Sequence, residues 1–309
     1  MNEEAKMPIL LSLSGGGFRG YFQANILKHM EDKFGYPLAN KFELIAGTSI
    51  GGINALALAA EVPTAKIVDF YREWGPKIFK KRRLTFGGVL YEKFSDSPLK
   101  EALEGIFKNL LIGDLKHKVL IPSVNYSTGA PQVFKTPHHV DLVMDKKLRV
   151  VDVALATSAA PTYFPIHKMD GENGCYMVDG GLVANHPGIY ACIEAEKFLG
   201  LANDSYKLLH IGTMSSGITD ACASVGSGFV KWGGALFDLS ISAQEKATEN
   251  ILNFKLGKER YLKIDVEPPK DQIKYIALDK AGAKSKEVLS QQATSAFQKA
   301  FSTLRDFIK

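Results

Sequence analysis

One serine in this chain stands in a setting that suits nucleophilic chemistry. Residues 46–52 read AGTSIGG and contain Gly47-x-Ser49-x-Gly51, after an apolar run of strand type and before a helical pattern. A serine on a tight turn between a strand and a helix is exposed at the top of a sheet. The helix dipole favours negative charge that develops at such a position. We therefore predict that Ser49 is a nucleophile for acyl transfer, with Gly47 and Gly51 supporting the turn.

A glycine run earlier in the chain offers backbone donors for the negative charge of such a reaction. Gly15, Gly16 and Gly17 lie in SLSGGGFRG, between another strand run and another helical pattern. Glycines let successive N–H groups converge on an anion, as they do in an oxyanion hole. We expect Arg19 either to add positive charge there or to anchor the loop.

The same glycines also fit a different kind of loop. Gly15, Gly17 and Gly20 have the G-x-G-x-x-G spacing of dinucleotide-binding loops. Such a site needs an acidic residue at the end of the second strand. Glu43 begins that strand rather than ending it, and the strand leads to Ser49 instead. The oxyanion hole is therefore the better interpretation, and a Rossmann-type nucleotide-binding protein is kept as an alternative.

The serine also needs a group that takes its proton. Asp179 ends an apolar strand in VDGGLVANHP and precedes Gly180 and Gly181, so its carboxylate is expected at the edge of the sheet. The rival arrangement is a Ser–Asp–His triad that uses His210, which follows a late strand run, or His186. The residues alone leave both arrangements open.

Runs of strand length alternate with helical patterns along the chain. This alternation predicts an α/β fold with a mostly parallel central sheet and helices on both faces. The expected strands are residues 8–14, 42–49, 117–127, 131–136, 174–181, 206–212 and 260–266. The expected helices are residues 19–35, 51–61 and 283–308.

Composition and length are those of a globular chain with room for a sizeable core. The 309 residues are 46% hydrophobic and carry a formal net charge of +5. We expect a single domain over 1–309, without linker or repeat. The mild positive charge would suit an anionic surface. The N-terminal residues are polar, no apolar stretch is long enough to span a membrane, and the three cysteines have no metal-like spacing. A cytoplasmic protein with no metal, no cofactor and at most peripheral membrane contact is therefore expected.

Two segments interrupt the alternation. Residues 75–115 mix four consecutive cations (80–83) with aromatic side chains. This insertion is expected to be either a solvated basic face or a lipid-facing lid. Residues 214–237 are rich in glycine and apolar side chains, which suits a mobile flap or a partner surface, or else a loop and a buried helix. We expect 75–97 or 214–237 to cover the site in a resting enzyme.

Four motifs together resemble the patatin-like phospholipases and cover roughly residues 8–190; the part from 200 to 309 is less diagnostic. They are SGGGFRG (14–20), GTSIGG (47–52), ATSAAPTYFP (156–165) and VDGGLVANHP (178–187).

The resemblance implies a three-layer α/β/α lipid acyl hydrolase of the phospholipase A type. It implies a Ser–Asp dyad in which Ser49 attacks the ester and Asp179 is the base without a histidine. Gly15 to Gly17 would hold the oxyanion, and ATSAAPTYFP would be a wall of the site. A general serine esterase or acyltransferase is kept as the alternative.

One departure from the family pattern concerns the residue before the three glycines, where many members have Asp and this chain has Ser14. In this form the loop resembles that of the patatin-like effectors of bacterial anti-phage (CBASS) systems. That resemblance implies activation by a cyclic dinucleotide and degradation of the cell's own membrane phospholipids. No nucleic-acid polymer is expected as a partner, and an oligomer is left open.

Overall fold

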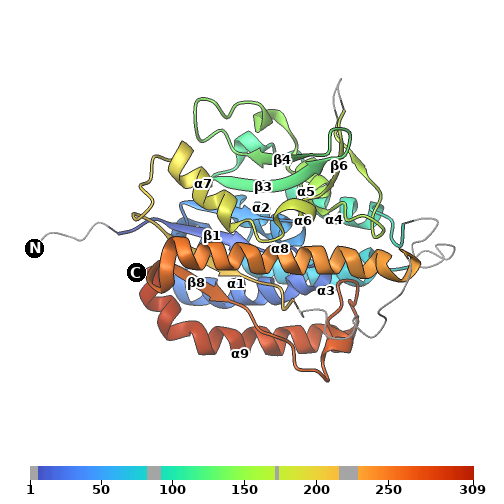
Figure 1. Ribbon diagram of the computed structural model, residues 1–309. Helices are drawn as coiled ribbons and strands as arrows, with labels where there is room; N and C mark the ends of the chain where they lie inside the picture. Colours follow the sequence, from blue (N-terminus) through green and yellow to red (C-terminus); the bar gives the residue numbers. More distant parts are fainter. Residues whose placement is uncertain (1–5, 82–91, 171–173, 216–228) are drawn as a thin grey trace, which may run out of the picture.

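The computed structural model describes residues 6–81, 92–170, 174–215 and 229–309, with only the backbone path given for 229–238. An eight-stranded sheet forms the centre (Figure 1). Its strands are β1 (Ile9–Leu13), β2 (Leu44–Gly47), β3 (Val119–Asn125), β4 (Ala130–Lys135), β5 (His167–Lys168), β6 (Tyr176–Asp179), β7 (Lys207–Ile211) and β8 (Tyr261–Ile264).

The sheet is mostly parallel, which confirms the predicted fold class. The strand order is β5-β6-β3-β2-β1-β7-β8, and β4 pairs with β3. The pairs β1–β2, β1–β7, β2–β3 and β7–β8 are parallel. The antiparallel pairs β3–β4, β3–β6 and β5–β6 lie together at one end of the sheet. The alternation of strand and helix in the sequence predicted the parallel part, because parallel strands need crossover connections.

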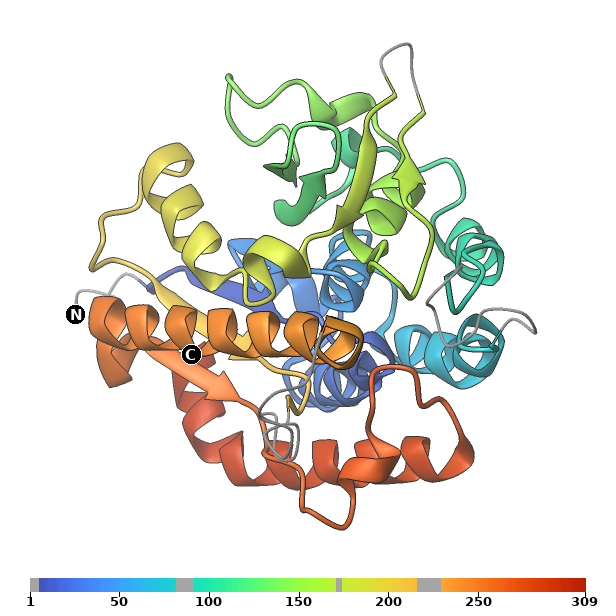
Figure 2. The same ribbon diagram turned by 45° about the vertical axis from the view of Figure 1, so that its right-hand side comes forward.

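Helices cover both faces of this sheet. They are α1 (Gly20–Phe34), α2 (Ile50–Ala59), α3 (Thr64–Ile78), α4 (Ser97–Phe107), α5 (Val150–Ser158), α6 (Gly181–Ala184), α7 (Gly188–Phe198), α8 (Phe229–Arg260) and α9 (Ala283–Ile308). Figure 1 shows α8 crossing in front of the sheet and α9 running along the lower side of the molecule. In the turned view of Figure 2, α7 and α8 lie next to each other, as their contacts require.

Successive residues of the buried strands point to opposite faces and build two cores. Ile9, Leu11 and Leu13 of β1 belong to the core beneath α1, α2 and α9, whereas Leu10 and Leu208 face α7 and α8. This period of two is the geometry of an extended chain that is buried on both faces. The three-layer α/β/α arrangement follows from it.

Two long elements have bounds that the sequence did not predict, although a loop followed by a helix was one of the two alternatives for residues 214–237. Helix α3 reaches into the expected insertion 75–115, which also contains α4. Helix α8 begins within the expected flap 214–237; residues 216–228 of that flap and residues 82–91 of the insertion lie outside the described residues. The lid functions of these segments and the single-domain organisation stay predictions.

Strand β3 has two partners on one of its edges, and this arrangement creates the site. Leu120 pairs with β2 and with β4, whereas Ser123 pairs with β4 and with β6. A strand residue has one neighbour on each edge, so β2 and β6 share the edge opposite β4. Strand β2 runs parallel to β3 and β6 runs antiparallel, so the two strands end facing each other. Their ends carry the chain to Ser49 and to Asp179.

Candidate active site

Ser49 occupies a sharp turn between β2 and α2. Its backbone has φ 54° and ψ −127°, a combination that is costly for a residue with a side chain. Its N–H donates to the hydroxyl of Thr157 at 2.9 Å. A side chain on Gly47 or Gly51 would collide with the backbone, Gly47 against Gly51 itself and Gly51 against the end of β1. Both glycines therefore allow the close approach that the turn requires.

Ser49 and Asp179 are directly hydrogen-bonded. The Ser49 hydroxyl donates to Asp179 Oδ2 at 2.6 Å, and the Gly181 N–H donates to Asp179 Oδ1 at 2.6 Å. A side chain on Gly180 would strike the carbonyl of Pro122, so the turn after Asp179 also lies tight against β3. Burial raises the pKa of Asp179 to about 6, against the opposing effect of its two hydrogen bonds. The carboxylate can therefore act as a base near neutral pH.

The glycine loop lies next to the serine. A Cβ placed on Gly15 would be 3.1 Å from the Ser49 Cβ. The N–H of Gly15 donates to the Asn185 carbonyl at 3.1 Å, so the expectation that Gly15 supplies an oxyanion donor needs correction. Within the described part of the chain, the N–H groups of Gly16 and Gly17 donate to no other residue. These two groups can bind an oxyanion.

Arg19 and Gly20 support the loop from the start of α1. Arg19 Nε donates to the Gly16 carbonyl at 3.3 Å. This bond anchors the loop, which is one of the two functions expected of Arg19. A side chain on Gly20 would meet the Tyr71 hydroxyl and Ile50. The loop is thus held against the α2 turn that carries Ser49.

A largely apolar cavity of about 350 Å³ opens beside the serine and the aspartate. Its walls include the Gly15–Arg19 loop and several aromatic and aliphatic side chains, such as Phe18, Ile53, Phe70 and Phe79. Ser158, Tyr163 and Phe164 of the ATSAAPTYFP segment also line it, in agreement with its expected place as a wall. Ile241, Ser242 and Glu245 of α8 line the opposite part. An acyl chain would find apolar surroundings here.

The two candidate histidines lie elsewhere. His186 and His210 stack with ring centroids 3.5 Å apart, and His210 contacts the hydroxyls of Ser12 and Ser14 at 3.2 and 3.4 Å. Burial lowers the pKa of both, that of His186 to about 3. Among the described residues that line the cavity there is no histidine. The triad alternative therefore has no support in the geometry.

Two further features bear on cofactors and membranes. Among the described residues, no group of three or more His, Cys, Asp or Glu side chains could hold a metal ion. In the same part of the chain, no helix combines the length and the apolar character needed to cross a bilayer.

Sequence reasoning missed two polar residues at the site, although both lie in motifs that it had singled out. Thr157 accepts the Ser49 N–H and donates to the Pro122 carbonyl at 2.6 Å. Asn185 contacts the glycine loop through its backbone carbonyl and its side-chain amide. Their types suggested no chemistry, and the site residues that they contact, Ser49 and Gly15, are more than 100 residues away in the chain. The side chains of α8 at the cavity had no sequence signal at all.

Comparison with known proteins identifies the class. A family model described as patatin-like phospholipase matches residues 11–191. The chain belongs to the patatin-like phospholipase family, which confirms the predicted fold and the predicted class of enzyme, a serine hydrolase acting on lipid esters.

Individual relatives are similar over nearly the whole chain. A protein of Pseudomonas aeruginosa named cGAMP-activated phospholipase is 45% identical over 297 residues, which is 94% of this chain and 88% of the relative. A protein of the same name from Vibrio cholerae is 34% identical over 342 residues, covering 97% of this chain and 94% of the relative. The structure of human GIVD cytosolic phospholipase A2 has a TM-score of 0.53 at 10% identity. The match covers 100% of this chain and 61% of the human chain, so the two proteins share the fold.

Proposed function

We propose that this chain is a phospholipase A-type enzyme that works with a Ser49–Asp179 dyad. The observation that carries the proposal is the 2.6 Å hydrogen bond from the Ser49 hydroxyl to Asp179 Oδ2 at the wall of an apolar cavity. A serine is a weak nucleophile until an adjacent base takes its proton. Here the adjacent base is a carboxylate that burial has made more basic than usual.

Acylation uses this pair together with the glycine loop. Ser49 Oγ attacks the carbonyl carbon of the lipid ester while its proton moves to Asp179 Oδ2. The carbonyl oxygen becomes an oxyanion, and the N–H groups of Gly16 and Gly17 bind it. When the carbon–oxygen bond to the glycerol breaks, the proton passes from Asp179 to the departing alkoxide. The lysolipid leaves as an alcohol, and the fatty acyl group stays on Ser49 as an ester.

Deacylation repeats the steps with water. Asp179 takes a proton from the water, the hydroxide attacks the acyl ester, and the same N–H groups bind the second oxyanion. The proton then returns to Ser49 as the fatty acid leaves. The start of α2 lies beside Ser49, and the positive end of its dipole favours both anionic intermediates.

We further propose that cGAMP activates the enzyme and that it degrades the cell's own phospholipids in anti-phage defence. The names of the two similar bacterial proteins support this activator. The enzyme would then act from the cytoplasm and contact the membrane only peripherally. An uncontrolled phospholipase in that compartment would damage its host, so a resting state of low activity is expected.

The test is hydrolysis of a fluorogenic phospholipid in vesicles, with and without cGAMP, by the wild type, Ser49→Ala and Asp179→Ala. We expect cGAMP-stimulated release of fatty acid from the wild type alone, unaffected by EDTA. Activity in folded Ser49→Ala would overturn the nucleophile, and strict dependence on Ca²⁺ would overturn the mechanism. Cleavage of soluble esters but of no phospholipid would indicate a general esterase instead.

A further inference from the structure

The carbonyl groups of Ser14, Gly15 and Gly16 are all held by hydrogen bonds from other residues. The Ser14 carbonyl accepts from Gln23 Nε2 at 2.9 Å, and the Gly16 carbonyl accepts from Arg19 Nε at 3.3 Å. The Gly15 carbonyl accepts from Thr213 Oγ1 at 2.8 Å and from Asn185 Nδ2 at 3.4 Å. A glycine-rich loop has little stiffness of its own, so these bonds determine its shape.

Fixing the Gly15 carbonyl also aims the N–H of Gly16. The two groups belong to one planar trans peptide unit, in which the C=O and the N–H point in opposite directions. A rotation of this unit that released the carbonyl from Asn185 and Thr213 would turn the Gly16 N–H away by the same angle. Oxyanion donors act only when they are oriented before the charge develops. The residues that hold the Gly15 carbonyl therefore also fix the orientation of the Gly16 N–H.

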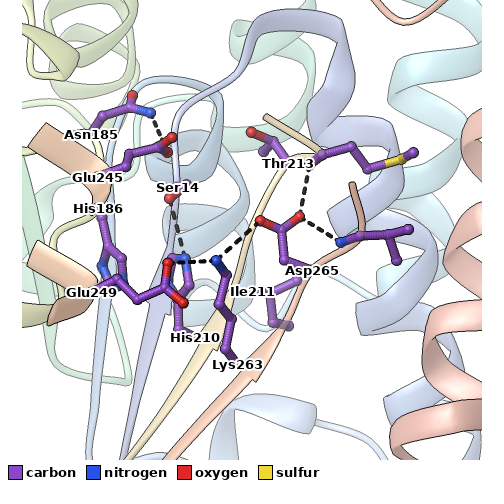
Figure 3. Close-up of polar contacts among 12 residues, drawn as sticks. Ser14, Asn185, His186, His210, Ile211, Thr213, Glu245, Glu249, Lys263 and Asp265 are labelled. Carbon is purple, nitrogen blue, oxygen red and sulfur yellow. Dashed lines mark hydrogen bonds and ion pairs between the residues drawn. The ribbon is translucent and has the colours of Figure 1, made fainter. Parts of the chain in front are cut away.

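Asn185 is buried, with 3% of its surface exposed, and its hydrogen bonds run in two directions. Its backbone carbonyl accepts from the Gly15 N–H at 3.1 Å, and its side-chain amide donates to the Gly15 carbonyl. The same amide nitrogen donates to Glu245 Oε1 of α8 at 2.7 Å, as Figure 3 shows. Both partners of the Asn185 side-chain amide, the Gly15 carbonyl and the Glu245 carboxylate, are acceptors, so the orientation of the amide group is fixed.

Glu245 thus orients the Asn185 amide. A hydrogen bond to a carboxylate is stronger than one to a neutral carbonyl, and the shorter distance to Glu245 agrees with this. One hydrogen of the amide is directed at the carboxylate, and the second is then directed at the Gly15 carbonyl. The neighbouring Gln244 holds the same region of α8 by accepting the Asn185 N–H at 2.6 Å.

We infer that Asn185 is a positioning residue for the oxyanion hole and that Glu245 couples this positioning to helix α8. The inference rests on the proposed function, since it assigns how the Gly16 donor is aligned. A change in the position of α8 would loosen the Asn185 amide, the Gly15–Gly16 peptide and the oxyanion donor in that order. The activity of the dyad then depends on a helix that supplies neither the nucleophile nor the base.

The first experiment compares kcat and KM for Asn185→Ala, Glu245→Ala and Glu245→Gln, with cGAMP present. Asn185→Ala should lower kcat by about 10- to 100-fold with KM within about threefold, because the lost alignment matters only in the transition state. Glu245→Gln keeps an acceptor for the amide and should stay near the wild type, whereas Glu245→Ala should fall toward Asn185→Ala. Glu249→Ala is the matched control on α8, because Glu249 binds Lys263 and not Asn185. It should leave kcat unchanged.

A second variant separates alignment of the loop from attachment of α8. Asn185→Asp combined with Glu245→Gln restores a hydrogen bond between the two positions, with the donor now on α8, but offers no donor to the Gly15 carbonyl. If Asn185 aligns the loop, this double variant stays at low kcat. Recovery of kcat would show that Asn185 only fastens α8 and would overturn the inference, as would an unchanged kcat in Asn185→Ala. A wild type that hydrolyses no ester, or an active Ser49→Ala, would instead overturn the proposed function.

Discussion

The backbone N–H of Ser49 donates to the hydroxyl of Thr157 at 2.9 Å. The same hydroxyl donates to the carbonyl of Pro122 at 2.6 Å, at the place where β3 has passed the end of β2 and has not yet met β6. Thr157 therefore links the turn after β2 to the middle of β3, and it supports the strained backbone of the nucleophile from α5.

Replacing Thr157 by Val should impair both stability and turnover. Val has the shape of Thr but its side chain forms no hydrogen bonds, so the buried Ser49 N–H and the Pro122 carbonyl would lose their partner. We expect the free energy of unfolding to fall by about 1–3 kcal/mol. We expect kcat to fall as well, because the Ser49 backbone is less firmly held. Urea unfolding and steady-state kinetics check this. Thr157→Ser keeps the hydroxyl and should restore both quantities; an unaltered Thr157→Val would refute the assigned link.

The rate should depend on pH through Asp179. Its carboxyl accepts the serine proton only when ionised, and its pKa is raised to about 6. Below that pH, kcat/KM should fall about tenfold per pH unit, and above about pH 7 it should be level. A soluble ester is the suitable substrate, because lipid packing also changes with pH. Burial lowers the pKa values of His186 and His210, and neither histidine lines the described part of the cavity. An inflection near pH 4 instead would mean that burial does not raise the pKa of Asp179.

Asp179→Asn should raise stability at neutral pH. A carboxyl whose pKa rises from 3.8 to about 6 on folding contributes stability in its protonated form, and this is lost as pH rises through 6. The neutral amide avoids that loss, so we expect the variant to be about 1–3 kcal/mol more stable at pH 8. The difference should shrink as pH falls toward 4. Urea unfolding at several pH values measures it. A less stable Asp179→Asn at pH 8 would contradict the assignment.

His210→Gln should keep its activity while losing stability. His210 is buried, stacks on His186 and contacts Ser12 Oγ at 3.2 Å, so its replacement should lower the free energy of unfolding by about 1–3 kcal/mol. Its loss of kcat should stay well below the ~10²-fold that removal of a general base costs. Kinetics at a temperature where the variant is folded by circular dichroism decide the matter. A folded but inactive His210→Gln would restore the triad.

Much of the fold could be predicted because its strands are short, apolar and separated by helical patterns. Residues 8–14 and 42–49 were expected as strands and contain β1 and β2. The extent of helix α8 could not be predicted in this way, because its first turns are rich in glycine and its exposed side carries an apolar residue. That residue is Phe254, which is 92% exposed. A helix with apolar residues on its exposed side does not show the usual amphipathic period.

The candidate site could be predicted where a residue type and its local turn carry the chemistry. Ser49 and Asp179 were singled out for this reason, and the structure brings them together, although their catalytic functions stay proposals. Thr157 and Asn185 act through hydrogen bonds to distant backbone groups, which have no pattern in a single sequence. Gly15 shows the same limit, since only the fold reveals that its N–H is already bound.

The cavity is assembled from two unequal parts of the chain. One part of its lining comes from the segment that the family model matches, residues 11–191, and carries the dyad and the glycine loop. The other part comes from later residues, which include Ser215, Ile241 and Ile276. Substitutions in this later part can change which lipids are admitted while Ser49 and Asp179 stay untouched. Chimaeras that exchange the C-terminal third between relatives but keep Glu245 should therefore exchange substrate preference and leave the chemistry in place.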